Sequence, residues 1–517
     1  MGIKLFLLIL FFAVMVGVGF YSRRHVNSVD GFVLGGRSVG PWLTAFAYGT
    51  SYFSAVVFVG YAGQFGWKYG IASTWIGIGN ALIGSLLAWV ILGRRTKVMT
   101  QHLSAKTMPD FFGQRYGSKS LKIVASVIVF VFLIPYTASV YNGLSRLFGM
   151  AFNIPYTWCV IAMAVFTAIY VILGGYMATA INDFIQGIIM LFGIVAVIAA
   201  VLNGQGGFME AVSKMAQIPS DVPATMGQPG AFTAFFGPDP LNLLGVVILT
   251  SLGTWGLPQM IGKFYAIKDE KSINTGTVIS TLFAIVISGG CYFLGGFGRL
   301  FDSAEIYNAE TGAVVYDSII PSMLSKLPDI LIGIVVVLVL SASMSTLSSL
   351  VLTSSSTMTL DLLKDNIMKE MSEKKQIITM QILIVFFIVV SVVIALDPPT
   401  FIAQLMGISW GALAGAFLAP FLYGLYWKGV TRAGVWAGFI AGVGITVSNM
   451  FIGYIASPIN AGAAAMVAGL VIVPLVSLVT PKLKKEDVDE IFTCYEEKVV
   501  STKKRNLEIC SCWGICL

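Results

Sequence analysis

Apolar segments of bilayer-spanning length recur along most of the chain, and they constrain its fold more than any other feature. A membrane-spanning helix needs about 20 apolar residues, and about thirteen segments meet that requirement. Only 11% of the 517 residues are charged, whereas soluble domains carry about 25%. We therefore predict an all-α polytopic membrane protein with about thirteen transmembrane helices. The predicted spans lie near residues 3–21, 41–66, 71–93, 120–149, 156–174, 181–201, 241–265, 274–297, 328–360, 377–396, 400–427, 433–453 and 461–480.

The loops between these spans alternate in charge across the membrane. The loops at 202–240 and 298–327 carry more acidic than basic residues, whereas the loops of the other side are basic. Because basic loops stay in the cytoplasm, we predict an outside N-terminus, a cytoplasmic C-terminus and a location in the cell membrane. The net charge of +7 then requires no nucleic-acid partner. The basic residues counted on the cytoplasmic side are Arg23, Arg24, Arg37, Arg94, Arg95, Lys97, Lys263, Lys268, Lys271, Lys369, Lys374, Lys375, Lys428, Arg432, Lys482, Lys484 and Lys485.

A stretch rich in hydroxyl groups, residues 341–359, lies at the end of an apolar span. It carries no charge, and 12 of its 19 residues are Ser or Thr. Ala342, Ser345, Thr346 and Ser349 follow one another at i, i+3, i+4 and i+7, which places them on one face of a helix. Such a face offers oxygen ligands to a partly dehydrated Na⁺. Alternatively, the hydroxyls bond to carbonyls of their own helix, or the small residues allow close helix packing.

Two predicted spans contain residues that interrupt helices. The span at 41–66 is rich in small and hydroxyl residues around 49–55, and the span at 241–265 contains Gly253, Gly256 and Pro258. These spans are five apart in order, which indicates two inverted repeats of five helices that place a solute near the membrane midplane. A simple proline kink is the alternative. The predicted regions are 1–40 with the first helix, 41–201 and 241–427 as the repeats, 202–240 outside, 428–480 with two peripheral helices, and 481–517 as a cytoplasmic tail.

Asp183 is the one carboxylate next to a span whose position is compatible with a functional role. It lies at the start of the segment 181–201. An acid in a first helical turn complements the helix dipole, whereas a carboxylate at a membrane edge is also typical of an ion route. The cysteines of the tail, Cys494, Cys510, Cys512 and Cys516, have no firm zinc spacing with histidine, and no role is assigned to them.

Four motifs in order resemble those of the sodium:solute symporter family over about residues 1–480. DGFVLGGRSVGPWLTA (30–45) is similar to an acidic-aromatic loop with LxGR, and TMPDFFGQRYG (107–117) to TxPEFxxxRFG. GGYMATAINDFIQ (174–186) resembles GGxxAxxxTDxxQ, and SASMSTLSS (341–349) resembles the hydroxyl-rich ion helix. The resemblance implies a leucine-transporter-type core and Na⁺-driven alternating access, with no cofactor other than the coupling ion.

The resemblance also implies cation sites. A first sodium site would use the carbonyls of Thr50, Phe53 and Ala342 with the hydroxyls of Ser345 and Thr346. A second site, present in some members, would use Asp183 with Ser345, Ser348 and Ser349. Asn182 stands where the family often has Thr, but the rest of the ligand set is present, so the resemblance allows either one or two Na⁺ per cycle.

The family's solute pocket is lined by three core helices. The residues carried over to it are Tyr52, Val56, Val57, Gln64, Tyr136, Trp255 and Gln259. Tyr52 replaces an aspartate typical of proline carriers, and the two valines offer nothing to sugar hydroxyls. A small solute with a carboxylate fits best, since a helix N-terminus at a break can hold it. An amino-acid (proline-like) symporter and a sugar symporter remain alternatives.

Other classes of function have weaker support. The sequence shows no ring of charges, which argues against a channel or uncoupled facilitator. The 37 residues after 480 are too few for a signalling domain, which argues against a membrane sensor. The only histidines are His25 and His102, and P-loop, GxSxG and HExxH motifs do not occur. We therefore expect a transporter of a small molecule that resides in the lipid bilayer, and not an enzyme.

Overall fold

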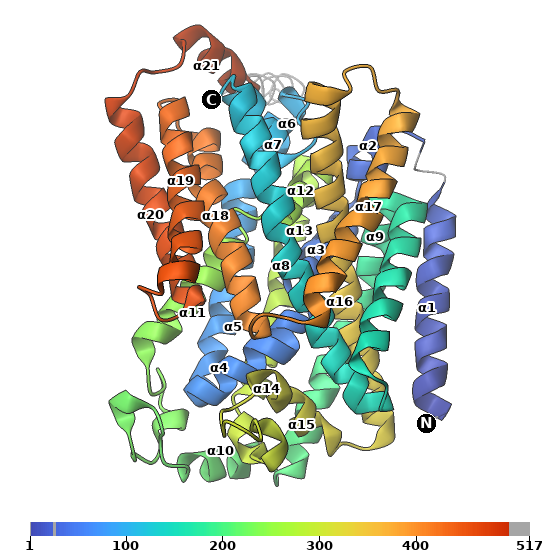
Figure 1. Ribbon diagram of the computed structural model, residues 1–517, viewed down its shortest axis with the longest axis vertical. Coiled ribbons are helices and arrows are strands. Elements are labelled where there is room, and N and C mark those ends of the chain that lie inside the picture. The colour runs from blue at the N-terminus through green and yellow to red at the C-terminus, as the bar shows by residue number, and fades with distance from the viewer. Residues whose placement is uncertain (1, 24–26, 496–517) are drawn as a thin grey trace, which may run out of the picture.

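The computed structural model describes residues 2–23 and 27–495, and it is a bundle of long helices (Figure 1). Within these residues, 11 helical segments are long and apolar enough to cross a membrane. The predicted all-α membrane class is thereby confirmed. Cys510, Cys512 and Cys516 of the tail lie outside the described residues. The helices named below are α1 (Gly2–Ser22), α2 (Val29–Leu34), α3 (Pro41–Tyr52), α4 (Ala62–Tyr69), α5 (Thr74–Gly79), α6 (Arg94–His102), α7 (Met108–Arg115), α8 (Lys119–Phe152), α9 (Tyr156–Gly204), α10 (Phe208–Ala216), α11 (Pro240–Gly253), α12 (Pro258–Ala266), α13 (Glu270–Ala284), α14 (Gly290–Gly295), α15 (Ile319–Ser325), α16 (Asp329–Thr357), α17 (Glu373–Leu396), α18 (Ile402–Tyr426), α19 (Arg432–Ile452), α20 (Pro458–Val479) and α21 (Lys485–Phe492).

The helical segments differ from the predicted spans where glycines interrupt long helices. The segment Val56–His102 joins the end of the second predicted span to the third, and it contains Gly70 at φ +60°. The helix α9 covers the fifth and sixth predicted spans, and it contains Gly175 at φ +53° and ψ −146°. An L-residue rarely adopts a positive φ, so both positions favour glycine and both interrupt a regular helix.

Both predicted helix breaks are present in the structure. The helix α3 ends at Tyr52, and Phe53 has extended backbone with φ −109° and ψ 94°. The helix α11 ends at Gly253, and α12 begins at Pro258 after an extended Leu257. Pro258 occupies the first turn of α12, where its missing N–H costs no hydrogen bond. The two predictions rested on glycine, hydroxyl and proline residues, and these residues lie at the breaks.

The two ends of the bundle carry different segments. The N-terminus lies at the same end as α10 and α15, whereas α6, α7 and α21 lie at the opposite end, where the described chain stops (Figure 1). The loops 202–240 and 298–327, which we predicted to share one side, therefore lie together.

The centre of the bundle is formed by α16 and α18. Nearly all residues of α18 are buried, and so is the hydroxyl-rich part of α16. The helix α16 packs against α3, α8, α9 and α12, so its hydroxyl groups meet both broken segments. On the outside, apolar side chains such as Phe192, Phe451 and Val479 are exposed, as expected for a surface that faces lipid.

Candidate functional site

The end of α3 meets the hydroxyl-rich face of α16. The Ser345 hydroxyl donates to the carbonyl of Thr50 at 3.1 Å and to that of Ala342 at 3.1 Å. The Thr346 hydroxyl donates to the same two carbonyls at 3.3 and 3.1 Å. The structure thus brings together four of the five residues expected at a first sodium site. Phe53, the fifth, follows directly after α3, where the backbone leaves the helical path.

This cluster contains neutral oxygen atoms in a buried setting. Thr50, Ser345 and Thr346 are fully buried, and Ala342 is nearly so. Carbonyl and hydroxyl oxygens replace the hydration shell of a small hard cation, and their neutrality keeps binding weak enough for release. The hydroxyls bond both to carbonyls of their own helix and across to α3, so hydrogen bonding within the helix is confirmed and ion binding stays a prediction.

A second cluster lies beside the first, and one of its members was missed by sequence reasoning. Lys263 of α12 is buried, and its ammonium nitrogen lies 3.8 Å from a carboxylate oxygen of Asp183 on α9, with side chains 3% and 0% exposed. The same nitrogen donates to the Ser349 hydroxyl at 3.0 Å. The prediction that Lys263 belongs to a basic loop is wrong, because α12 continues past the break and carries this lysine into the core.

The hydroxyl groups of the expected second site point in different directions. Ser349 contacts Lys263 and also hydrogen-bonds to Ser51 at 2.8 Å. Ser348 donates instead to the carbonyl of Ser345 at 2.9 Å. Neither carboxylate oxygen of Asp183 has a hydrogen-bond partner among the described residues. Within the expected second site, Asp183 and Ser349 therefore both contact the ammonium group of Lys263.

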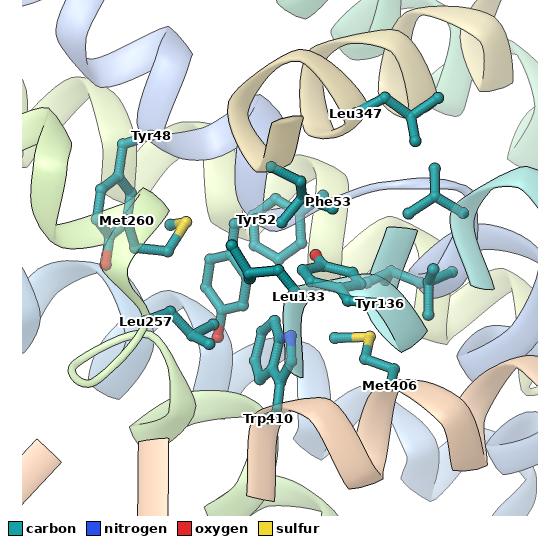
Figure 2. Close-up of a cluster of buried hydrophobic side chains, with 14 of the residues drawn as sticks. Tyr48, Tyr52, Phe53, Leu133, Tyr136, Leu257, Met260, Leu347, Met406 and Trp410 are labelled. Atoms are coloured by element: carbon teal, nitrogen blue, oxygen red, sulfur yellow. The ribbon is translucent and has the colours of Figure 1, made fainter. Parts of the chain in front are cut away.

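Aromatic side chains surround the break after α3 (Figure 2). The ring of Tyr52 stacks on Phe53 with centroids 4.2 Å apart, and its hydroxyl donates to the carbonyl of Thr250 on α11 at 2.6 Å. Trp410 of α18 lies 6.0 Å from Tyr52 and 5.9 Å from Tyr136, measured between ring centroids. Sequence reasoning did not find Trp410, since an aromatic residue within an apolar span carries no special signal.

The other residues expected to line the solute pocket are also buried. Trp255 donates from its indole nitrogen to the carbonyl of Ile83 at 3.0 Å, and Val56 and Val57 lie directly after the break. Gln64 has a buried amide oxygen with no partner among the described residues, and Gln259 has both amide atoms in this state. Unpaired buried polar atoms cost about 1–3 kcal/mol each, so these amides are suited to a polar group of a solute.

Two cavities lie toward opposite ends of the bundle, and the narrower one reaches the site. A narrow one of about 40 Å³ is lined by Lys106 and Thr107 from the end with α6 and α7, and further in by Gln259, Lys263 and Ser349. A volume of this size holds a water molecule or two. A wider one of about 580 Å³ lies among the loops of the other end, and its charged or amide lining residues are Lys68, Asp221, Asp239, Asn242, Arg299 and Asn460.

A buried carboxylate also lies at the end with the wider cavity, outside the spans. Asp317 accepts a hydrogen bond from the backbone N–H of Ile402 at 3.3 Å, and the guanidinium of Arg146 lies 4.0 Å away. Burial raises the pKa of Asp317 to about 6, and Arg146 and the backbone hydrogen bond partly oppose this shift. This carboxylate joins the start of α18 to α8.

The chain matches known proteins over most of its length. The model of the sodium:solute symporter family matches residues 32–442. The sodium/proline symporter of Staphylococcus aureus (strain NCTC 8325 / PS 47) is 30% identical over 495 residues, which is 92% of this chain and 92% of the symporter.

Two solved structures share the arrangement of helices. A Na⁺-coupled sialic acid symporter, in a substrate-bound outward-open state, has a TM-score of 0.75 at 16% identity and covers 93% of this chain and 99% of its own. Mhp1, a nucleobase-cation-symport-1 family transporter in a closed conformation with bromovinylhydantoin bound, has a TM-score of 0.54 at 12% identity, with 89% and 97% covered. At these identities, the likeness shows a common fold.

Proposed function

Because the chain belongs to the sodium:solute symporter family, we propose that it imports a small solute with a carboxylate group, coupled to Na⁺ by alternating access. The observation that carries the proposal is the contact of Ser345 and Thr346 with the carbonyl of Thr50 at the break after α3. Thr50, Phe53, Ala342, Ser345 and Thr346 would hold the ion. Asp183, Ser345, Ser348 and Ser349 would form a second cation position.

The proposal includes an orientation and a symmetry. About thirteen spans, with an outside N-terminus and a cytoplasmic C-terminus, would place two inverted five-helix repeats at 41–201 and 241–427 in the cell membrane. The breaks that open these regions, after α3 and before α12, support the pairing. The narrow cavity at Lys263 would then face the cytoplasm, and the wide cavity would face outside.

A carboxylate-bearing solute is supported by the chemistry of the pocket. The N-terminus of α12 lies at a break, and Gln259 in its first turn has unpaired amide atoms. Helix N-termini attract anions through their free N–H groups and the helix dipole. Proline and sialic acid, the solutes named for the two Na⁺-coupled relatives, both carry a carboxylate. Tyr52, Val56, Val57, Gln64, Tyr136, Trp255 and Gln259 are the proposed contacts.

The sodium gradient supplies enough free energy for concentrative uptake. A membrane potential of 100 mV is worth about 2.3 kcal/mol per charge, and a tenfold Na⁺ gradient adds about 1.4 kcal/mol. One Na⁺ therefore provides roughly 3.7 kcal/mol, which corresponds to a few hundredfold accumulation of a neutral solute.

Uptake into proteoliposomes tests the proposal. Labelled proline, small monocarboxylates, other amino acids and sugars are offered separately, with an inward Na⁺ gradient or with an equal K⁺ gradient. We expect one carboxylate-bearing class to accumulate only with Na⁺. Sugar uptake alone would replace the carboxylate proposal by the sugar alternative. Uptake of any solute that merely equilibrates in both salts would identify an uncoupled facilitator.

A further inference from the structure

The pair formed by Lys263 and Asp183 places a positive charge where the second cation position is proposed. Lys263 lies in the second turn of α12, and Asp183 lies eight residues after the interruption of α9 at Gly175. The ammonium nitrogen is 3.8 Å from Asp183 and 3.0 Å from the hydroxyl oxygen of Ser349. It also lies 5.3 Å from the centroid of the Tyr176 ring, a favourable cation–π distance.

Each member of this pair depends on the other. Asp183 has no hydrogen-bond donor among residues 2–23 and 27–495, and Lys263 is its ion-pair partner. An ionised side chain inside a membrane protein is costly unless an opposite charge lies beside it. A carboxylate on α9 and a hydroxyl on α16 are groups that would otherwise ligate Na⁺, but here they contact an ammonium group.

We infer that the Lys263 ammonium is a built-in cation that fills the second cation position, so that the protein binds one Na⁺ per cycle. This inference rests on the proposed function and assigns its ion stoichiometry. A tethered cation cannot leave with the solute, and only the ion at Thr50, Ser345 and Thr346 can be released.

Hydrogen bonds connect the tethered cation with the proposed sodium site. Lys263 donates to Ser349, and Ser349 bonds to Ser51. Ser51 directly follows Thr50, whose carbonyl accepts from both Ser345 and Thr346. Lys263 and Ser349 also line the narrow cavity, whose other lining residues include Lys106 and Thr107 from the end with α6 and α7. The tethered cation therefore links the proposed sodium site to this cavity.

Counting bound Na⁺ tests the inference without knowledge of the solute. Purified protein in detergent is titrated with radioactive sodium in a scintillation proximity assay, and bound ions per chain are determined. We expect one ion for the wild type and two for Lys263→Met, because the unpaired Asp183 then recruits Na⁺. The double variant Lys263→Met/Asp183→Asn should return to one. Lys268→Met, which removes an exposed lysine from the same region, is the matched control and should bind one.

Two results would overturn the inference. One is a wild type that already binds two ions. The other is a monodisperse Lys263→Met protein that still binds one. If Lys263→Met fails to fold, the wild-type count and a Lys263→Gln variant decide the question. The double variant Ser345→Ala/Thr346→Ala separates this result from the proposed function. If it still binds one ion, the proposed first site fails, whatever Lys263 does.

Discussion

Two positions along α16 that we propose for cations differ in the groups that surround them. At Ser345 and Thr346 the surrounding groups are neutral oxygens from α16 and the end of α3, whereas at Ser349 they are a carboxylate and an ammonium group. Neutral oxygens bind a small ion loosely enough for release. A buried ion pair, in contrast, is held by the cost of separating its charges. In the proposed mechanism, the same helix combines an exchangeable site at Ser345 and Thr346 with a fixed one at Ser349.

The largest effect is expected when the carboxylate of the fixed position is removed, which tests whether the ion pair holds the lysine in place. Asp183→Asn leaves the Lys263 ammonium buried without a counter-charge, and losing one partner of a buried pair costs about 3–5 kcal/mol. We expect a large drop in the thermal unfolding temperature of the purified protein. Asp183→Asn/Lys263→Met removes both charges and should recover most of the loss. Equal loss in the single and double variants would show that the pair has no energetic coupling.

The next largest effect is expected at the exchangeable position. Ser345→Ala/Thr346→Ala removes two oxygens that face the proposed ion, and each is worth about 1–2 kcal/mol. The Na⁺ concentration for half-maximal uptake should rise at least about tenfold, with less change in solute affinity at saturating Na⁺. Ser343→Ala is the matched control on the same helix, because among residues 2–23 and 27–495 its hydroxyl bonds only to the Val339 carbonyl, at 2.7 Å. If Ser345→Ala/Thr346→Ala shows the same Na⁺ activation as Ser343→Ala, the assignment of the sodium site is wrong.

Asp317 is a second buried carboxylate with a cationic neighbour, and it can be compared with Asp183. The guanidinium of Arg146 lies 4.0 Å from it. The pKa of Asp317 is raised to about 6, so between pH 4 and 6 this carboxyl group is protonated more often in the folded protein than in the unfolded chain. The free energy of unfolding contributed by this group therefore falls as pH rises through that window, by at most about 1.4 kcal/mol per pH unit, and is flat above it. Asp317→Asn should abolish this contribution, as measured by unfolding of both proteins across pH 4 to 7.5. An unchanged slope in the variant would contradict the assignment.

The smallest effect is expected in the solute pocket. Tyr52→Phe keeps the ring that stacks on Phe53 but removes the hydroxyl that donates to the Thr250 carbonyl. A neutral hydrogen bond contributes about 0.5–1.5 kcal/mol, so solute half-saturation should rise between about twofold and tenfold. The Na⁺ requirement should stay within about twofold of the wild type. A larger shift in Na⁺ than in solute would place Tyr52 with the ion instead.

Local signals in the sequence predicted much of this molecule. The breaks near Phe53 and Pro258 follow from glycine, hydroxyl and proline residues that act on the backbone within a turn. The hydroxyl face of α16 follows from the helical period, and the structure brings Thr50, Ala342, Ser345 and Thr346 together at it. The proposed ion itself remains a prediction.

Features that depend on distant contacts were not predictable in the same way. The partners Lys263 and Asp183 are far apart in the chain, and the packing of α12 against α3, α6 and α16 buries the lysine beside Asp183. Trp410 lies next to Tyr52 and Tyr136 only because of where α18 packs in the bundle. The number of spans is uncertain from sequence because glycines such as Gly175 interrupt helices without adding polar residues.

The inferred role of Lys263 would also change how uptake responds when sodium becomes scarce. At low Na⁺, a carrier that must capture two ions before moving its solute slows with the square of the sodium concentration, so a tenfold fall reduces its rate about a hundredfold. A carrier with one position already filled slows only about tenfold under the same change. If Lys263 fills the second position as inferred, the chain would give up steepness of accumulation for a rate that falls less as sodium falls.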